Sequence, residues 1–179
     1  QMDVVMVGAG TIIADDPRLT CRLAGGRDPL RVVVDGRLRV PLAARVLTKT
    51  AARGTVLATV NANQRKLNAY RARGAEVLTL PGRDGRLSLR RLLRQLAARG
   101  VNTVLLEGGA TLAAAALREG VVDRIALFLA PKLVGGDGIP MLASLGVRTM
   151  AGAPALRISG IEAVGVDWLV RAEPEFRGV

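Results

Sequence analysis

The sequence predicts an α/β fold whose central sheet is largely parallel. Two observations carry this prediction: short aliphatic runs recur along the first 106 residues, and three helical segments each end at a glycine that is soon followed by another aliphatic run. Repeated alternation of strand and helix is typical of parallel sheets, because a helical crossover returns the chain to the edge where the next strand begins. At 179 residues the chain suits one domain, so we expect a single domain over 1–179.

Five runs rich in Val, Leu and Thr are the predicted strands of this sheet. Several of them are nearly continuously apolar rather than alternating, which is typical of strands buried on both faces of a parallel sheet. We therefore expect helices on both sides of the sheet. The five runs are Val4–Val7, Leu30–Val34, Thr55–Val60, Glu76–Leu80 and Thr103–Leu106.

Three segments have the pattern of amphipathic helices. In 88–100 four leucines fall on one face at helical spacing, Ser88 is suited to the N-cap, and Gly100 is suited to end the helix. The segment Gln64–Arg73 ends in the same way at Gly74, and Thr111–Glu119 ends at Gly120.

After Gly120 the helical periodicity gives way to strands. Asp123–Pro131 is predicted to be a long strand, and the glycine-rich 132–138 that follows is predicted to be a loop. Leu156–Ile161 and Gly165–Arg171 are separated by a short turn, so we expect an antiparallel pair at the C-terminus.

Composition excludes several classes of protein and site. The apolar stretches are interrupted well before the roughly 20 residues that cross a bilayer, and the start of the chain lacks the features of a secretory signal, so we expect a cytoplasmic protein with no membrane partner. The sequence has no histidine and one cysteine, Cys21. We therefore expect no internal disulfide, no Cys/His zinc site and no histidine catalysis.

The formal charge of +11 favours anionic partners. One alternative is therefore that the chain is a non-catalytic nucleotide- or RNA-binding module. Single-stranded nucleic acid is bound on aromatic platforms, however, and aromatic residues make up only 2% of this chain. A phosphorylated small molecule fits better, and solvation alone explains most of the arginines.

The first segment with chemical interest is 7–20, where a strand runs into Gly8, Gly10 and Thr11. It departs from the G-x-G-x-x-G dinucleotide fingerprint because Ile13 stands at the third glycine position. Glycines still permit close backbone approach to a phosphate. An ordinary strand-to-loop turn is the alternative, in which Asp15 and Asp16 only shape the chain before Pro17.

The second segment is 105–117, where Glu107 ends a strand and Gly108-Gly109 opens a helix of small residues. A carboxylate at the end of a buried strand is costly without a partner or ligand. Unpaired N–H groups at the helix start suit a pyrophosphate. The alternative is that the alanines only allow close helix packing. We expect the two segments, near 8–15 and 107–115, to converge into one cradle for a phosphate-bearing cofactor.

In combination, these and other motifs resemble a known family. They closely resemble the C-terminal reductase half of bacterial bifunctional riboflavin-biosynthesis deaminase-reductases, and the resemblance covers nearly the whole chain. The motifs, in order, are Asp3–Thr11, Ala14–Arg22, Pro29–Gly36, Glu107–Leu112, Val122–Arg124 and Ala130–Gly136.

The resemblance implies a dihydrofolate-reductase-like fold, a homodimer and an NADPH-dependent reaction. That reaction reduces 5-amino-6-(5-phosphoribosylamino)uracil to its ribitylamino form by transferring a hydride to the sugar C1′. A reductase of the same fold that acts on another pterin or pyrimidine is the nearest alternative.

The resemblance also implies which residues bind each ligand. Substrate contacts fall on Leu19, Arg22 and Glu107, and Glu107 is a tentative catalytic residue that relays a proton. Arg22 suits a phosphate or ribose, because a guanidinium is an always-charged, forked donor; the alternative is a surface arginine. The implied NADPH contacts are Thr11, Asp15, Gly36, Gly109, Ala110, Thr111, Leu112, Ala113, Ala114 and Ala115.

The chain departs from the family pattern at its start. Members normally begin the reductase half with a strand, a Ser-x-Asp-Gly segment and a helix, and we expect these elements to be missing here. The zinc deaminase half needs a His-x-Glu and a Pro-Cys-x-x-Cys motif, so deamination is not predicted for this chain.

Overall fold

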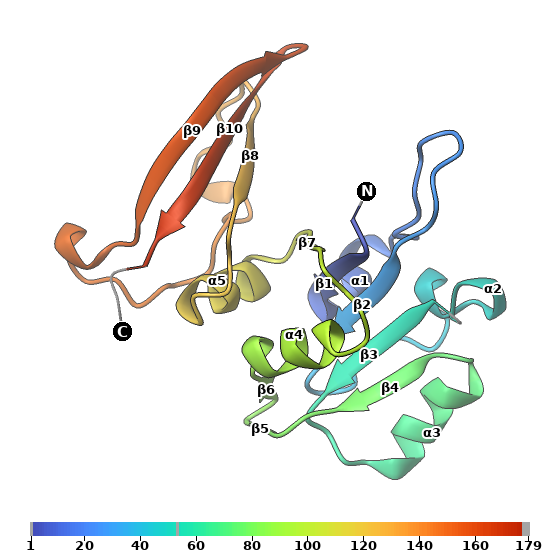
Figure 1. The fold of residues 1–179 in the computed structure, drawn as a ribbon. Helices are drawn as coiled ribbons and strands as arrows, with labels where there is room; N and C mark the ends of the chain where they lie inside the picture. The colour runs from blue at the N-terminus through green and yellow to red at the C-terminus, as the bar shows by residue number, and fades with distance from the viewer. Residues whose placement is uncertain (1, 53, 177–179) are drawn as a thin grey trace. The chain divides into compact units, whose positions relative to one another are not determined.

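A computed structural model describes residues 2–52 and 54–176 of the chain. The chain divides into two compact units, Gln1–Ala113 and Ala114–Val179. The first unit contains a five-stranded sheet and a small hairpin, and the second a three-stranded sheet (Figure 1). The predicted single reductase domain over 1–179 stays a prediction.

The sheet of the first unit is entirely parallel, as the sequence predicts. Its strands are β1 (Val4–Gly8), β2 (Leu30–Val34), β3 (Thr55–Thr59), β4 (Glu76–Thr79) and β7 (Val104–Leu106), in the order β4-β3-β2-β1-β7. The carboxyl ends of parallel strands meet at one edge of a sheet, and the register aligns Gly8 of β1 with Val34 of β2.

Burial follows the predicted pattern in β1, β2 and β3 but not in the two edge strands, β4 and β7. The side chains of β3 are all buried, and those of β1 and β2 are mostly so. In β7, however, Leu105 is 41% exposed. The expectation that 103–106 is buried on both faces is therefore wrong, because β7 is an edge strand of this sheet and has a neighbour on one side only.

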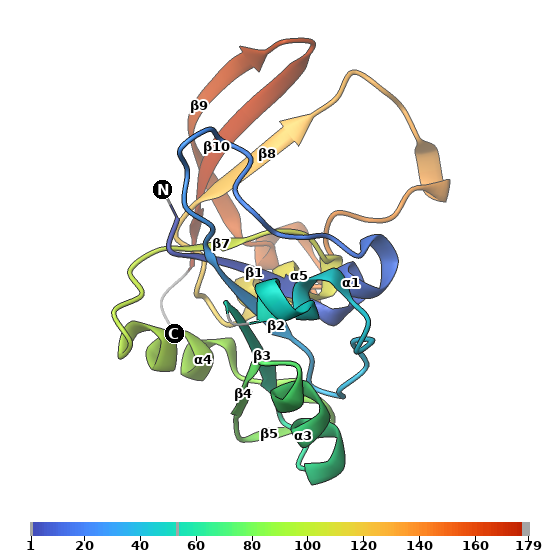
Figure 2. The same ribbon diagram turned by 90° about the vertical axis from the view of Figure 1, so that its right-hand side faces the viewer.

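Helices cover both faces of the sheet, as expected. Ile12 of α1 (Ala9–Asp15) and Leu67 of α3 (Gln64–Ala72) join one buried cluster with Val7, Val33 and Leu57 of the strands. Figure 2 shows α4 on the other side of the strands. Helix α4 (Leu89–Ala97) has the predicted N-cap, because the Ser88 hydroxyl accepts the N–H of Arg91. The short helices η1 (Arg45–Leu47) and α2 (Lys49–Ala52) were not predicted.

The three predicted glycine stops are confirmed, and they share one hydrogen-bond pattern. In each, the residue after the glycine donates its N–H to a carbonyl five residues earlier, which satisfies a carbonyl that the helix leaves unpaired. Helices α3, α4 and α5 (Ala110–Arg118) end in this way. The bonds run from Ala75 to Tyr70, from Val101 to Leu96 and from Val121 to Ala116.

Asp3 fastens the start of β1 to the turn before β7. Its carboxylate accepts the backbone N–H groups of Asn102 and Thr103, both at 2.9 Å, and its own N–H donates to the Thr103 hydroxyl at 2.9 Å. The hydrogen bonds from Asn102 and then Thr103 hold the pKa of the Asp3 carboxyl below its usual value, because they stabilise the charged form. The pairing of β1 with β7 therefore begins at a defined point.

A short hairpin of β5 (Gly82–Arg83) and β6 (Arg86–Leu87) follows β4 and was not predicted. Its two strands are only two residues each, too short for a hydrophobic pattern. Asp84 and Gly85 form its tip, and both have positive φ.

The second unit has an antiparallel sheet of β8 (Ile125–Leu129), β9 (Ala155–Val164) and β10 (Asp167–Glu175), in the order β8-β10-β9. The predicted C-terminal antiparallel pair is β9 and β10, and the predicted long strand is β8, which pairs with β10. The predicted loop 132–138 contains one short 3-10 turn, η2 (Gly135–Asp137); a second, η3 (Met150–Gly152), precedes β9.

A β-bulge makes one face of this sheet apolar. Ile158 pairs with Ala172 and Gly160 with Arg171, so Ser159 is an extra residue in β9. The extra residue shifts the side-chain alternation by one. Ile161 therefore lies on the same face as Ile158. The whole apolar face consists of Ile125, Leu127, Leu129, Leu156, Ile158, Ile161, Ala163, Trp168, Val170, Ala172 and Pro174.

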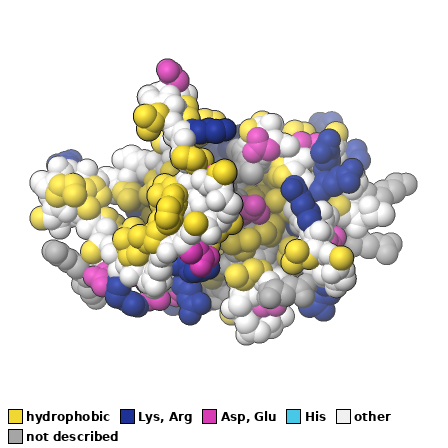
Figure 3. All heavy atoms as spheres, turned by 90° about the horizontal axis from the view of Figure 1, so that it is seen from above, with side chains coloured by type: hydrophobic (Ala, Val, Ile, Leu, Met, Phe, Trp, Pro, Cys, Tyr) yellow, Lys and Arg dark blue, Asp and Glu magenta, His cyan; other side chains and the backbone are white. Residues whose placement is uncertain are grey.

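The opposite face of the same sheet carries the charged residues of the three strands together with some apolar ones, such as Phe128 and Leu169. Two cross-strand ion pairs lie on it, Arg157 with Glu173 and Arg171 with Glu162. On the apolar face, Ile158 and Ile161 are each 58% exposed, and Trp168 is 51% exposed. Figure 3 shows large hydrophobic side chains exposed at the molecular surface. Exposed apolar area of this extent indicates an interaction surface.

Among the described residues, none of the helices has the length and apolar character that a bilayer-spanning segment needs.

Tyr70 gives a test of the packing between α3 and the loop after β2. Its buried hydroxyl donates to the Val40 carbonyl at 2.6 Å, and burial, followed by the nearby Asp35, raises the pKa of Tyr70 to about 12. We expect Tyr70→Phe to lower the free energy of unfolding at pH 8 by about 1–2 kcal/mol, because the Val40 carbonyl loses its donor.

The same group predicts how stability depends on pH. The folded pKa is raised above the unfolded value near 10, so its stabilising effect is complete below pH 10 and is lost as the pH rises towards 12. Urea unfolding of both proteins from pH 8 to pH 12 measures this. The difference between wild type and Tyr70→Phe should shrink above pH 10; a constant difference would contradict the assignment.

Candidate functional site

The two glycine-containing strand ends lie side by side at the carboxyl edge of the parallel sheet. Met6 of β1 pairs with Leu106 of β7, and the Glu107 N–H donates to the Met6 carbonyl at 2.9 Å. A Cβ added at Gly109 would lie 3.3 Å from the Thr11 hydroxyl oxygen. The predicted convergence of the two segments is therefore confirmed, while the cofactor they are predicted to hold stays a prediction.

Two consecutive glycines turn the chain from β7 into α5. Gly108 and Gly109 have φ of +73° and +88°, a region that residues with a Cβ rarely adopt. The Gly109 carbonyl then accepts the N–H groups of Leu112 and Ala113. The first N–H groups of the helix point out of its end without helical partners, next to Thr11.

Of the two adjacent aspartates, Asp16 has a structural role. It takes φ of +40°, and its carboxylate accepts the Arg45 N–H at 2.8 Å and lies 3.5 Å from the Arg45 Nε. Asp15, the last residue of α1, is exposed. Asp16 thus shapes the loop, whereas Asp15 is exposed at the end of α1.

Gly36 follows β2 at the same edge of the sheet. A Cβ at Gly36 would lie 1.8 Å from the carbonyl oxygen of Gly85 in the hairpin tip, so only glycine fits there. Because Gly8 pairs with Val34, the Gly36 turn lies beside the start of α1.

A pocket of about 260 Å³ brings together two of the three residues implied to bind substrate, Leu19 and Glu107. Arg22 is exposed and is not one of the lining residues, so its contact with substrate stays a prediction. The full lining is Met2, Val5, Leu19, Thr20, Cys21, Leu23, Arg27, Pro29, Leu105 and Glu107.

Leu19 is held in an unfavourable backbone conformation at this pocket. Its φ is +53°, and a bulky residue in the left-handed region costs roughly 1–3 kcal/mol. Its side chain packs against the buried cluster beneath α1 and α3. Strain of this kind persists only where the surroundings impose it, and it clusters at functional sites.

The structure corrects the physical argument made for Glu107. Glu107 is exposed, and the strand before it is an edge strand that is partly exposed. Its carboxylate therefore escapes the desolvation penalty that a buried strand end would impose. Its place in the pocket, rather than the cost of burial, is what marks it.

Sequence reasoning missed several lining residues. Arg27 is a cation in the loop before β2, and Cys21, whose N–H donates to the Asp28 carboxylate at 2.9 Å, lies in the same loop. The loop folds back over β1 and β7, which the sequence does not reveal. The motif Ala14–Arg22 was the one signal that pointed to this segment.

Comparison with known proteins decides the family. Residues 1–170 match the family model of the RibD C-terminal domain. The chain belongs to the RibD C-terminal domain family. It is 34% identical over 171 residues to the riboflavin biosynthesis protein RibD of Actinobacillus pleuropneumoniae. The matched region covers 95% of this chain and 46% of that protein. The chain therefore spans about half the length of such RibD relatives.

A second relative is shorter. The chain is 36% identical over 174 residues to the 2,5-diamino-6-ribosylamino-4(3H)-pyrimidinone 5′-phosphate reductase of Methanothermobacter thermautotrophicus, covering 95% of this chain and 79% of that one. Among solved structures, the chain is similar to Acinetobacter baumannii RibD, with a TM-score of 0.81 and 27% sequence identity. The superposition covers 97% of this chain and 47% of the Acinetobacter chain. The dihydrofolate-reductase-like α/β fold that the resemblance implied is confirmed.

Gly109 tests whether the two strand ends touch in solution. We expect Gly109→Ala to lower the free energy of unfolding by about 1–3 kcal/mol through backbone strain and crowding against Thr11. In a Thr11→Ala background the cost should fall by roughly 0.5–1 kcal/mol, because the crowded hydroxyl is gone. Urea denaturation of the four proteins of this double-mutant cycle measures the coupling.

Gly100 is the matched control for this cycle. Its φ is +85°, and a Cβ there would meet nothing within 4 Å. Gly100→Ala should therefore show the strain alone, with the same cost whether or not Thr11 is present. Equal coupling of both glycines to Thr11 would contradict the contact.

Proposed function

We propose that this chain is an NADPH-dependent reductase that converts 5-amino-6-(5-phosphoribosylamino)uracil to its ribitylamino form in riboflavin biosynthesis. The observation that carries the proposal is the adjacency of two features at one sheet edge. The glycine-containing ends of β1 and β7 meet there, and Glu107, which continues β7, lines a pocket of about 260 Å³. The printed names of the relatives, RibD and a pyrimidinone phosphate reductase, support it.

The residues at this edge fit a phosphate-bearing cofactor. A Cβ at Gly10 would meet nothing within 4 Å, so the backbone there is open to a ligand. The α5 N-terminus, with no acidic residue in its first turn, favours an anion. NADPH would supply the hydride. The residues proposed to hold it are Thr11, Asp15, Gly36 and Gly109 to Ala115.

The protein's part in the reaction is mainly one of positioning. As the hydride adds to C1′ of the substrate, the bond from C1′ to the ring oxygen breaks, its electron pair stays on that oxygen, and the oxygen takes a proton. Aligning two bound reactants can lower a barrier by roughly 7 to 11 kcal/mol. Leu19 and the apolar Val5 and Leu105 form the walls against which the substrate would lie.

Glu107 is the proposed proton relay. It is the acidic residue among those that line this pocket, and an exposed carboxyl exchanges protons readily with water. Arg27 from the pocket and Arg22 from the same loop are the proposed partners of the substrate phosphate, because guanidinium groups bind phosphate through paired hydrogen bonds.

A second substrate has a specific observation in its favour. The chain is 36% identical over 174 residues to the Methanothermobacter protein, whose name gives 2,5-diamino-6-ribosylamino-4(3H)-pyrimidinone 5′-phosphate as substrate. The two substrates share the phosphoribosylamino group that is reduced and differ in the pyrimidine ring.

Turnover tests the function and the role of Glu107 together. With NADPH, the chain should reduce the phosphoribosylaminouracil or the pyrimidinone analogue and leave dihydrofolate unreduced. Glu107→Gln should lower kcat by about 10²–10⁴-fold, the typical contribution of a positioned acid. The affinity for NADPH should stay the same. Unchanged kcat at saturating substrate would remove Glu107 from the chemical step.

Cys21 gives a control that does not depend on turnover. It is the one cysteine of the sequence and lines the pocket. If Glu107 acts in the chemical step rather than in binding, substrate should slow the reaction of Cys21 with a thiol reagent both in the wild type and in Glu107→Gln.

Preferential reduction of dihydrofolate would refute the riboflavin assignment.

We further propose that the protein is a homodimer in which the apolar face of β8, β9 and β10 is covered by the same face of a second copy. The face holds eleven apolar residues and no charged one. A symmetric dimer buries such a self-complementary surface on both copies at once. Burial of apolar area drives association at roughly 25 cal/mol per Å² before the costs of binding.

Charge on the apolar face should dissociate this dimer. Light scattering should give twice the chain mass of 18.8 kDa for the wild type and the single mass for Ile158→Lys or Ile161→Lys. Val164→Lys is the matched control, because Val164 is exposed on the same strand but lies on the opposite face. The single tryptophan, Trp168, should show blue-shifted emission only in the dimer. A dimer that survives Ile158→Lys would refute this interface.

A further inference from the structure

One wall of the pocket beside Glu107 is formed by a loop with little packing of its own. More than half of the lining residues come from the pocket loop, 19–29, which joins α1 to β2. Figure 1 shows this segment running out from the parallel sheet and back to it. Residues 22–28 are all exposed, so burial does not hold this part of the loop in place. Its conformation therefore depends on specific polar contacts.

Asp28 closes the pocket loop near its end. One of its carboxylate oxygens accepts the Cys21 N–H at 2.9 Å, which joins the two sides of the loop. Inside the closed part, Gly26 donates its N–H to the Leu23 carbonyl at 3.0 Å, and a Cβ at Gly26 would collide with the Cys21 Sγ. The side chain of Cys21 thus lies against the backbone of Gly26. The position of the Asp28 carboxylate therefore decides the conformation of 21–28.

The other carboxylate oxygen of Asp28 faces a buried arginine. It lies 3.8 Å from Nη1 of Arg31, whose side chain is 5% exposed against 52% for Asp28. Arg31 stands in the buried strand β2, where a charged group is costly unless it has partners. Burial lowers the pKa of the Arg31 guanidinium, and the negative charge of Asp28 opposes this shift. The loop is thus linked to a charge that belongs to the core.

The guanidinium of Arg31 is fixed from its other side. Its Nε donates to the Thr55 hydroxyl at 3.2 Å, and its Nη2 donates to the Ala51 carbonyl at 2.6 Å. A Cβ at Gly54 would lie 2.6 Å from Nη2, so the backbone approaches the group closely there. Two of the three nitrogens are therefore held by α2 and β3, and Nη1 is directed towards Asp28.

We propose that Arg31 and Asp28 are positioning residues that hold the pocket loop in the conformation to which substrate binds. The inference rests on the proposed function, which places substrate in the pocket beside Glu107. Neither residue is among those that line the pocket. The core holds Arg31, Arg31 orients the Asp28 carboxylate, and that carboxylate holds Cys21 and the chain around it. A wall that is formed in advance lowers the ordering cost of binding.

Hydrogen–deuterium exchange of the full chain tests the loop without turnover. Asp28→Ala should raise the exchange rate of the backbone amides in the pocket loop by about tenfold or more, because the Cys21 N–H loses a charged acceptor. Asp28→Asn keeps an acceptor for this N–H and loses only the ion pair. The pair is long and half exposed, so the rate should then rise by only about twofold to fivefold. Exchange in α4 should be the same in all these proteins.

Arg31→Met tests whether the buried guanidinium acts through Asp28. The substitution replaces a buried charge with an apolar side chain of similar length, a change that proteins often tolerate. Exchange in the pocket loop should rise as much as in Asp28→Asn. The double variant should exchange no faster than either single variant, because both changes break the same link. Additive effects would refute the link between the two residues.

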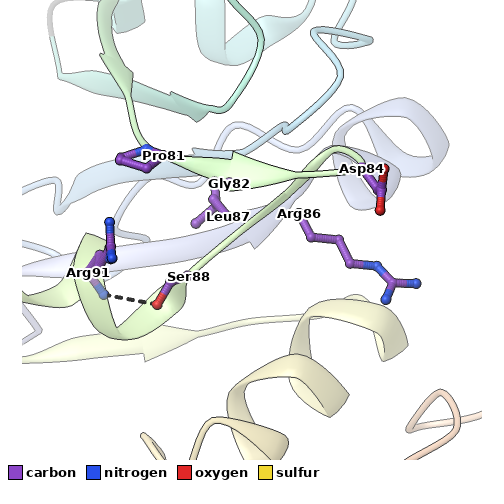
Figure 4. A pocket seen from close by; sticks show the side chains of 7 residues that line it. All are labelled: Pro81, Gly82, Asp84, Arg86, Leu87, Ser88 and Arg91. Atoms are coloured by element: carbon purple, nitrogen blue, oxygen red, sulfur yellow. Dashed lines mark hydrogen bonds between the residues drawn. The ribbon is translucent and has the colours of Figure 1, made fainter.

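Arg86→Met is the matched control for Arg31→Met. Arg86 is exposed and lines a different pocket, of about 530 Å³, at the β5–β6 hairpin and the start of α4. Figure 4 shows its side chain extending away from Ser88 and Arg91. The substitution makes the same change of net charge at a distance in sequence from the pocket loop. Both the exchange rate of the pocket loop and the KM for substrate should stay the same.

Steady-state kinetics connects the loop to the substrate. Asp28→Ala should raise the KM for substrate by about fivefold or more, because only the fraction of molecules with the loop in place binds it. At saturating substrate kcat should change less than about twofold, since the loss is one of binding rather than of chemistry. Asp28→Asn should restore most of the affinity, because it keeps the acceptor for the Cys21 N–H.

The outcomes separate this inference from the proposed function. If Asp28→Ala leaves exchange in the pocket loop unchanged, or speeds exchange and leaves KM unchanged, the positioning role is refuted while the reductase stands. A fall in kcat with an unchanged KM would refute it as well. If the wild type reduces none of the substrates, the proposed function is refuted, and the role of the two residues in substrate binding is refuted with it.

Discussion

The pairing of β1 with β2 on one side and β7 on the other is the constraint on which the candidate site depends. Three carboxyl ends are aligned by it: the Gly8 turn, the Gly36 turn and the Glu107–Gly109 turn. The Asp3 carboxylate sets the starting point of the β1–β7 ladder through its bonds to Asn102 and Thr103. Backbone hydrogen bonds thus place, within a few ångströms, residues that are about a hundred positions apart in sequence.

Much of the fold could be predicted, because its signals are local. Strands β1, β2 and β3 are nearly continuous apolar runs. Each predicted helix end is a glycine, and the residue after it donates its N–H to a carbonyl of the last helical turn. The hairpin β5–β6 could not be predicted, since two-residue strands have no periodicity. The exposure of Leu105 could not be predicted either, because whether a strand lies at a sheet edge depends on strand order, which is a property of the whole sheet.

The candidate site was predictable in part for the same reason. Glycines at 8, 10, 108 and 109 indicate, from the local sequence alone, chain turns that leave the backbone open to a ligand. That the two turns converge follows once β1 and β7 are known to be neighbours. The pocket walls from Cys21 and Arg27 depend on how a loop folds back, and nothing in their spacing indicates it. For Glu107, the sequence identified the residue while the physical argument from burial was wrong, because β7 is exposed.

The bulge at Ser159 has a consequence for which changes the second unit can tolerate. One surplus residue decides whether Leu156 and Ile158 lie on the same side of β9 as Ile161 and Ala163 or on the opposite side. Strand length between Ile158 and Ile161 therefore matters more than the chemical nature of the residue at 159. A polar-to-polar exchange there is a minor event, whereas loss of a single codon would place isoleucine among the charged pairs of the other side and divide the hydrophobic surface in two.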